Sequence, residues 1–170
     1  GEWPDVDRET NRRGVTLMSK RMASAGLTST TDAFGRDAAW VAYVDALSRD
    51  ELHFRLAFMP GGNAPIYEQM KKMGIRSGFG NDMLRVGAVK YAADGSASER
   101  TMRMSAPYEG TEDYGILTMS QAQIDEAVED VVANGFRVGI HANGDVTIAM
   151  VLDAYERVLE TWQGPNPRFR

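Results

Sequence analysis

The sequence predicts an α/β fold in which strand–helix units repeat around a parallel sheet. Short apolar runs of strand length alternate four times with amphipathic segments of helical length within 170 residues. Glycine follows most of the helical segments, as is common just beyond a helix C-terminus. Such units build either a doubly wound sheet or part of a (β/α)8 barrel. No glycine-rich nucleotide-binding motif follows any predicted strand, which leaves the doubly wound alternative without support from motifs.

The first half of the chain contributes two strands and three helices to this prediction. The side chains of Val15, Met18 and Met22 fall on one face of a helix. The Thr-rich run that ends at Asp32 and the continuous apolar run before Pro60 have the composition of strands. The predicted elements are helix 10–25 with Thr10 as its N-cap, strand 27–32, helix 37–48, strand 53–59 and helix 65–73.

A third strand, Leu84–Tyr91, carries a lysine where an apolar residue is expected. The other side chains of the run favour burial, and the run leads through Lys90 into the small-residue turn Asp94-Gly95-Ser96. Lysine is almost never fully buried unless it is paired. Lys90 therefore either extends its ammonium to solvent along a buried stem or has a chemical role.

The second half begins with a long segment, Ala92–Leu117, that has no convincing periodicity. It is interpreted either as a solvated, mobile loop or as a lid over a substrate. A Thr-x-x-Gln capping box at Thr118 starts the clearest helix of the chain. The strand Phe136–Ile140 and a helix capped by Asp145 follow, and Arg168-Phe169-Arg170 resembles the start of another strand.

Composition and charge exclude several classes of function. A net charge of −5 without a run of Lys or Arg argues against a nucleic-acid groove. No stretch approaches the ~18 apolar residues of a membrane span, and no signal pattern opens the chain. The absence of cysteine excludes disulfides and thiolate ligands and fits the reducing cytoplasm. A metal site or a Ser-His-Asp hydrolase must draw on His53 and His141.

Polar side chains follow three of the predicted strands at their carboxyl ends, where parallel α/β folds gather their chemistry. Asp32 follows the first strand, Lys90 and Asp94 follow the third, and His141 follows the fourth. His53 begins the second strand, at the opposite end of the sheet, and is interpreted as structural.

Lys90 and His141 allow two kinds of chemistry. If CO₂ converts Lys90 to a carbamate, the carbamate oxygens and the imidazole can hold a divalent metal ion, whereas an unmodified ammonium has no lone pair for a metal. Alternatively, burial lowers the pKa of the lysine, and the neutral amine attacks a carbonyl to form a Schiff base, as in a lyase. A non-catalytic half-barrel that serves as a scaffold is the third possibility.

Two segments, in this order, resemble the amidohydrolase superfamily. They are Val86-Gly87-Ala88-Val89-Lys90-Tyr91-Ala92-Ala93-Asp94-Gly95-Ser96 and Gly139-Ile140-His141-Ala142-Asn143-Gly144-Asp145. A third segment, Gly26-Leu27-Thr28-Ser29-Thr30-Thr31-Asp32, looks like the Gly-Val-Thr-Ser segment of the branch that includes N-substituted formamide deformylase-like proteins. The resemblance covers nearly the whole chain.

The resemblance implies a (β/α)8 barrel that binds one or two divalent metal ions, commonly zinc. By position, Lys90 would be the lysine on the fourth barrel strand that becomes a bridging carbamate, and His141 would be the metal ligand on the fifth strand. Asp94, Ser96 and Asn143 would contact the substrate or support the metal ligands. The implied reaction is hydrolysis of a small-molecule amide or formamide C–N bond by metal-activated water, with the general-base aspartate expected outside this chain.

Other parts of the family's site have no counterpart in the sequence. There is no His-x-His pair, and a full barrel needs about 250 residues. We therefore expect residues 1–170 to form a single partial (β/α)8 barrel domain of about four βα units, equivalent to strands two to five. We also expect this fragment to bind zinc weakly, to lack activity alone, and to self-associate through its unpaired sheet edges.

Overall fold

The structure is a computed structural model that describes residues 6–170. The chain divides into two compact units, unit 1 over Gly1–Ala88 and unit 2 over Val89–Arg170. Each unit combines paired strands with helices, which confirms the predicted α/β class. Over residues 6–170, every helix is too short or too polar to span a bilayer. That residues 1–170 form one domain stays a prediction.

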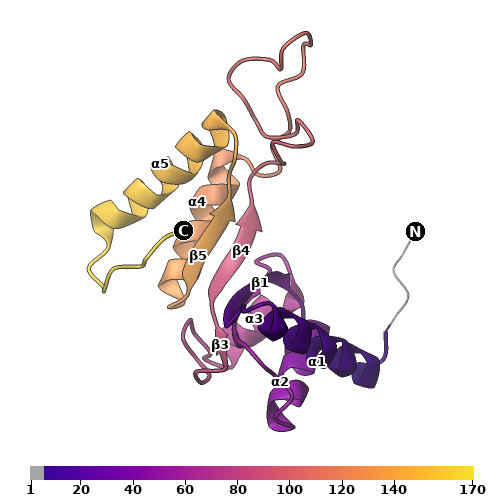
Figure 1. Cartoon of the computed structure of the whole chain (residues 1–170). Helices are drawn as coiled ribbons and strands as arrows, with labels where there is room; N and C mark the ends of the chain where they lie inside the picture. Colours follow the sequence, from indigo (N-terminus) through magenta and orange to yellow (C-terminus); the bar gives the residue numbers. More distant parts are fainter. Residues whose placement is uncertain (1–5) are drawn as a thin grey trace. The chain divides into compact units, whose positions relative to one another are not determined.

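Unit 1 contains a three-stranded parallel sheet and three helices. Strand β2 lies in the middle, and β1 and β3 pair with it in parallel on either side. Figure 1 labels the helices α1, α2 and α3 of this unit. The N-cap of α1 is Asp7 rather than the predicted Thr10, whose N–H donates to the Asp7 carboxylate. The elements in chain order are α1 (Arg8–Ser24), β1 (Ser29–Gly35), α2 (Asp37–Ser48), β2 (Arg55–Pro60), α3 (Pro65–Lys72) and β3 (Leu84–Val86).

An aromatic cluster occupies the core of unit 1. Phe58 on β2 is fully buried, and the ring centroids of Trp40 and Tyr43 on α2 lie 5.1 and 6.2 Å from the Phe58 centroid. Tilted and edge-on rings at such separations are favoured by the aromatic quadrupole. Burial alternates along β2, so every second side chain of this strand faces the core.

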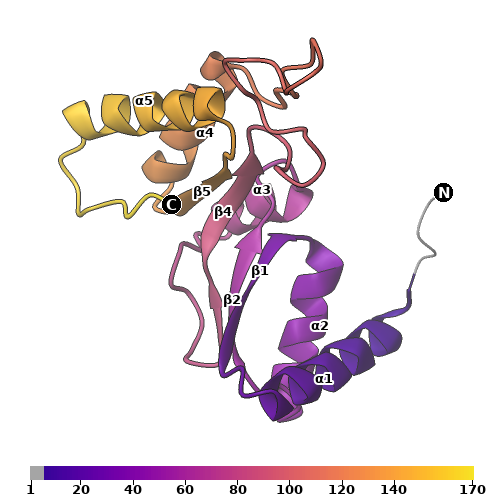
Figure 2. The ribbon, with the colours of Figure 1, turned by 45° about the horizontal axis from the view of Figure 1, so that its top comes forward.

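Unit 2 pairs two strands and packs two helices beside them (Figure 2). The elements are β4 (Ala88–Ala92), α4 (Gln121–Ala133), β5 (Arg137–His141) and α5 (Asp145–Thr161). Strand β4 lies next to β5, and the arrows of both strands point the same way in Figure 1. Helix α4 packs against both β5 and α5, and Val128, Val131 and Val138 are fully buried there.

The strand predicted over Leu84–Tyr91 is in fact two strands. Gly87 separates β3 from β4, and the Gly87 N–H donates to the Phe58 carbonyl at 2.6 Å. Strand β3 pairs with β2, whereas β4 pairs with β5. A continuous apolar run therefore serves two sheets, and the division between the units falls at the start of β4.

Two helix caps also differ from the predictions. The capping box of α4 is formed by Ser120 and Gln123, not by Thr118. The Thr118 hydroxyl instead donates to the carbonyl of residue 92 at 2.7 Å. Helix α5 has Gly144 as its N-cap, so Asp145 is the first helical residue rather than the cap.

The last residues of the chain lie beside β5. The Arg170 N–H donates to the Val138 carbonyl, and the Ile140 N–H donates to the Arg170 carbonyl, at 3.3 and 3.1 Å. This alternation is typical of parallel neighbours. The Phe169 ring stacks on Tyr155 with centroids 4.2 Å apart. The segment is not a strand in the structure, but it pairs with β5 where the predicted strand begins.

Candidate functional site

Lys90 on β4 and His141 on β5 lie on the same face of the two-stranded sheet of unit 2. Side chains alternate between the faces of a strand, and the fully buried Val89 and Val138 mark the face that packs into the core. Lys90 and His141 are half-buried on the other face. The Ala93 N–H donates to the His141 carbonyl at 2.8 Å, which sets His141 level with the end of β4.

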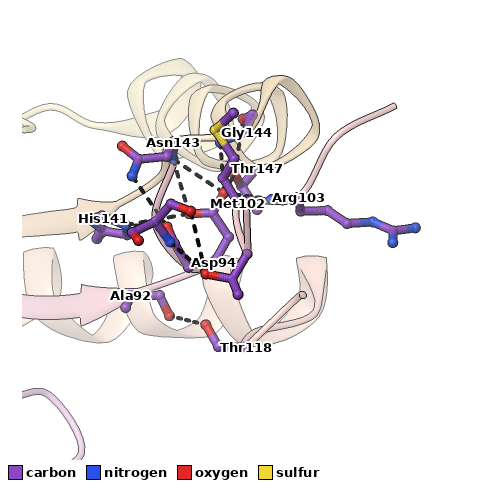
Figure 3. Close-up of polar contacts among 12 residues, drawn as sticks. Ala92, Asp94, Met102, Arg103, Thr118, His141, Asn143, Gly144 and Thr147 are labelled. Carbon is purple, nitrogen blue, oxygen red and sulfur yellow. Dashed lines mark hydrogen bonds and ion pairs between the residues drawn. The ribbon is translucent and has the colours of Figure 1, made fainter. Parts of the chain in front are cut away.

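The imidazole of His141 is held by the turn that follows β4 (Figure 3). Its Nε2 lies 2.7 Å from the carbonyl oxygen of Gly95 and 3.7 Å from a carboxylate oxygen of Asp94. Because a carbonyl oxygen can only accept a hydrogen bond, Nε2 carries the proton. The lone pair of the neutral ring is then on Nδ1, which is available to a ligand such as a metal ion.

Asp94 is a buried carboxylate that accepts hydrogen bonds from two other segments of unit 2. Its donors are the hydroxyl of Thr147 at 2.6 Å and the N–H groups of Gly144 at 2.7 Å, Asn143 at 3.0 Å and Arg103 at 3.0 Å. We call these five residues the Asp94 network. Burial by itself raises the pKa of Asp94, but the four donors together outweigh burial and hold the pKa below the ordinary value.

Asn143 belongs to this network, whereas the Ser96 hydroxyl is engaged within its own turn. Besides its backbone bond to Asp94, Asn143 donates from Nδ2 to the Gly95 carbonyl at 3.3 Å. The Ser96 hydroxyl donates to Glu99 at 2.6 Å. A contact of Ser96 with substrate or with a metal ligand stays a prediction.

The long segment after β4 is fastened directly to the start of α5 by Ser105, whose N–H and hydroxyl both donate to the Asp145 carboxylate, at 2.9 and 2.5 Å. The Arg103 N–H in the same segment donates to Asp94, which also accepts from Gly144 and Thr147 at the helix start. A Cβ added to Gly144 would overlap the Arg103 carbonyl, so the segment packs closely on the helix start. The segment projects beyond the strand ends of unit 2 (Figure 1) but is held to this unit by hydrogen bonds.

Sequence patterns do not single out Thr147, Arg103 or Ser105. Arg103 bonds to Asp94 through its backbone N–H group, which every residue type except proline supplies, and Ser105 bonds to Asp145 through its N–H as well as its hydroxyl. One signal does point to Thr147. Gly144 is the N-cap of α5 and has no side chain to accept a hydrogen bond, so the N–H groups at the helix start need an acceptor from another segment. A hydroxyl in the first turn, such as that of Thr147, can donate to the same acceptor.

In unit 1, Asp32 and His53 have different surroundings from the residues of unit 2. Asp32 lies within β1 rather than after it, and its carboxylate accepts from the hydroxyl of Tyr43 on α2 at 3.0 Å. Burial and the Asp32 charge raise the pKa of Tyr43. His53 is exposed and lies just before the amino end of β2.

The donors on this face of unit 2 fit part of a metal site. Residues 6–170 contain no group of three His, Asp or Glu side chains that could hold a metal ion. Two donors fit: the Nδ1 lone pair of His141 and the amine of Lys90 once it has reacted with CO₂. Burial lowers the pKa of Lys90, which raises the fraction of neutral amine. A site built from these two residues needs ligands from elsewhere.

Comparisons with known proteins bear on the family and the fold of the chain. The model of the Amidohydrolase family matches residues 3–169. Two solved structures are similar to the chain, those of an uncharacterized metal-dependent hydrolase from Pyrococcus horikoshii OT3 and of another from Pyrococcus furiosus. Their TM-scores are 0.82 and 0.83, and both are 22% identical in sequence. No curated protein matches the chain.

The two structural matches differ in how much of each protein they cover. They span 90% and 91% of this chain but 31% and 32% of the two hydrolases. The chain thus spans about a third of the length of these structures. The likeness confirms the predicted fold, which is part of a (β/α)8 barrel.

Proposed function

Because the chain belongs to the amidohydrolase family, we propose that it supplies part of the active site of a metal-dependent hydrolase. In this proposal, Lys90 and His141 hold a divalent metal ion, with zinc as the metal. The supporting observation is that these two residues lie on one face of the paired strands β4 and β5, with Lys90 in the middle of β4 and His141 at the end of β5. The remaining ligands and the general base come from outside the 170 residues.

The proposed role of Lys90 begins with its neutral amine. The amine nitrogen attacks CO₂, an N–C bond forms, and one proton is released, which leaves an anionic carbamate with two oxygen donors. His141 adds the Nδ1 lone pair, because its Nε2–H is bonded to the Gly95 carbonyl. When bound, the metal ion would lower the pKa of a water molecule and polarise a substrate carbonyl.

We propose that the substrate is a small molecule with an amide-type C–N bond, of which a formamide is one example. Hydrolysis of this bond yields an amine and a carboxylic acid. The resemblance of the Lys90 and His141 segments to the amidohydrolase superfamily supports the reaction class. The absence of cysteine from the sequence supports the cytoplasm as the compartment.

Zinc titration of the purified chain in bicarbonate buffer tests this proposal. We expect weak, saturable binding, because two residues supply the donors. Lys90→Ala and His141→Ala should each abolish binding, whereas His53→Ala, which removes the exposed histidine before β2, should leave it unchanged. Equal zinc binding by the wild type and by His141→Ala would overturn the metal site. Zinc binding that is unchanged in Lys90→Ala and does not depend on bicarbonate would refute the proposed carbamate on Lys90.

A Schiff-base lyase is the second candidate, because burial lowers the pKa of Lys90. The probe is pyruvate followed by borohydride, which reduces a Schiff base to a stable secondary amine on the lysine. A carbamate gives no such adduct. We expect mass spectrometry to find no pyruvate adduct at Lys90, and a stoichiometric adduct lost in Lys90→Ala would favour the lyase instead.

We also propose that the 170-residue chain self-associates and has no turnover alone. In the described sheet of unit 1, β1 occupies an edge beside β2, so its outer side offers N–H and C=O groups to another strand. Sedimentation equilibrium should show species larger than the monomer, and a stable monomer at low concentration would contradict this. Formamide hydrolysis that is lost in Lys90→Ala would show that the chain is catalytic by itself.

A further inference from the structure

We infer that Asp94 is a positioning residue for His141: its carboxylate fixes the turn that orients the imidazole and selects the Nε2–H form of the ring. The importance of this role for a metal ion rests on the proposed function. The contacts that support it all lie within unit 2.

The carboxylate first ties together the ends of two neighbouring strands. Asp94 lies just beyond β4, and its oxygens accept from the N–H groups of Asn143 and Gly144, which lie just beyond β5. Hydrogen bonds to an ionised acceptor are roughly twice as strong as those between neutral groups. The turn after β4 is therefore held against the turn after β5.

This tie places the Gly95 carbonyl against the imidazole. Gly95 directly follows Asp94, and its carbonyl oxygen accepts from His141 Nε2–H at 2.7 Å. The other side of Gly95 is fixed as well, because the Ser96 N–H donates to the Thr101 hydroxyl at 2.9 Å. A Cβ on Gly95 would overlap Thr101, so this close packing requires glycine. The acceptor for the ring proton is thus held in place from both sides.

The negative charge of Asp94 favours the same Nε2–H form of His141 as the hydrogen bond to Gly95 does. One carboxylate oxygen lies 3.7 Å from Nε2 of His141, which is too far for a hydrogen bond. A buried negative charge at this distance nevertheless favours a proton on the nitrogen that faces it. An imidazole that binds a metal is commonly oriented by an acceptor on its other nitrogen. Here that acceptor is the Gly95 carbonyl, which is held in position by the Asp94 carboxylate.

Asp145 provides a matched comparison within the same unit. It lies at the start of α5 and, like Asp94, holds the segment after β4, but its carboxylate accepts from Ser105 instead of from the residues beyond β5. If both carboxylates were merely structural, neutralising Asp94 or Asp145 would have the same effect on the His141 ring.

Nitrogen-15 NMR of the imidazole rings in the metal-free chain tests the inference. The sequence has two histidines, so a His53→Gln variant identifies the signals of His141. At a pH where the rings are neutral, we expect wild-type His141 to be almost entirely in the Nε2–H form. Asp94→Asn should change the ratio of the two tautomers several-fold toward Nδ1–H, whereas Asp145→Asn should leave the ratio unchanged.

Two results would overturn the inference directly. One is a folded Asp94→Asn chain with the wild-type tautomer ratio, and the other is an equal shift in Asp145→Asn. If Asp94→Asn does not fold, Thr147→Val serves in its place, because it removes one donor from the network and keeps the charge. It should produce a smaller shift in the same direction, and a folded Thr147→Val chain with the wild-type ratio would overturn the inference.

The zinc titration gives a separate answer on the proposed function. If the tautomer ratio depends on Asp94 but zinc does not bind at His141, the positioning role of Asp94 is supported and the metal site is refuted. If zinc binds at His141 but the ratio is independent of Asp94, the metal site is supported and the positioning role is refuted.

Discussion

Asp32 in unit 1 lies inside a strand and Asp94 in unit 2 lies just beyond one, and the surroundings of the two aspartates differ. Asp32 is half-buried and accepts from a side chain, the hydroxyl of Tyr43 on α2. Asp94 is buried and accepts from three backbone N–H groups and the hydroxyl of Thr147. The first carboxylate joins a strand to one helix, whereas the second joins a strand end, a long loop and a helix start.

The difference follows from where each aspartate lies along its strand. Asp32 is inside β1, where the backbone is already paired and the side chain meets a helix. Asp94 lies beyond β4, next to the start of α5, whose first N–H groups have no acceptor within the helix. A carboxylate beyond a strand end can hold several segments together when unpaired backbone N–H groups lie within hydrogen-bond distance of it. The position of the aspartate along its strand matters because it decides whether such N–H groups are nearby.

Replacing each aspartate by alanine should show the largest contrast. Asp94→Ala removes the carboxylate that accepts from four donors, two of them buried, so we expect a loss of about 3 kcal/mol in the free energy of unfolding. Asp32→Ala should cost about 1 kcal/mol, because it frees one tyrosine hydroxyl. Urea unfolding measures both losses, and hydrogen exchange of peptides shows which unit is affected.

The contrast fails if the two alanine variants lose similar stability. It also fails if Asp94→Ala accelerates hydrogen exchange in unit 1 as much as in unit 2. Either result would mean that the Asp94 network does not organise the start of α5 and the segment that precedes α4.

Gly144→Ala should produce the next largest effect, because it disrupts the packing of the segment after β4 against the start of α5 without removing a charge. The new Cβ would overlap the Arg103 carbonyl, so the segment after β4 must move away from α5. We expect a loss of about 2 kcal/mol and faster hydrogen exchange around residues 101–105. Gly14→Ala is the control: it places a Cβ in open space on α1 and should be neutral or slightly stabilising. Unchanged exchange in Gly144→Ala would refute the close packing.

The order of the elements was predictable from the sequence because the patterns that define them are local. Amphipathic spacing and the flanking residues predict α2 with both of its bounds, and the other helices to within a few residues. The break at Gly87 was not predictable in the same way, since each side of the glycine pairs with a different strand. The choice of pairing partner depends on contacts that are distant in the sequence.

The site was predictable to a smaller extent. The sequence pattern is enough to place Lys90 and His141 on strands, although Lys90 lies in the middle of β4 and only His141 lies at a strand end. Their shared face follows from the pairing of β4 with β5. The surroundings of Asp94 could not be read from the sequence. Three of its donors are backbone N–H groups, which carry no residue signature, and all four lie beyond the turn that contains Asp94. The chain has to fold before the carboxylate gains its partners.

The titrations of Asp94 and of Tyr43 should act on different units. The pKa of Asp94 is lowered in the folded state, so its contribution is complete above the ordinary carboxyl pKa of about 3.9 and is lost as the pH falls through the lower folded pKa. Burial and Asp32 raise the pKa of Tyr43, so its contribution is complete below about pH 10 and is lost as the pH rises through the folded pKa.

Circular dichroism against pH, at a urea concentration near the midpoint, measures these two losses. Asp94→Asn should reduce the loss on the acid side of the profile, and Tyr43→Phe should reduce the loss on the alkaline side, where Tyr155 in unit 2 still contributes because burial raises its pKa to about 12. An acid transition that is the same in the wild type and in Asp94→Asn would assign acid sensitivity to other carboxylates.

Tyr43→Phe at neutral pH should give the smallest effect and is the finest test of the comparison. It removes the hydroxyl that donates to Asp32 but keeps the ring, which packs edge-on against Phe58. We expect a loss of about 1 kcal/mol in urea unfolding, the usual value of a single hydrogen bond, with hydrogen exchange in unit 2 unchanged. In the double variant Tyr43→Phe with Asp32→Ala, the loss should be smaller than the sum of the two single losses, because both changes remove the same bond. Additive losses would show that Asp32 and Tyr43 contribute to stability separately. The contrast between one hydrogen bond at Asp32 and four at Asp94 would then not explain the different losses of the two aspartate variants.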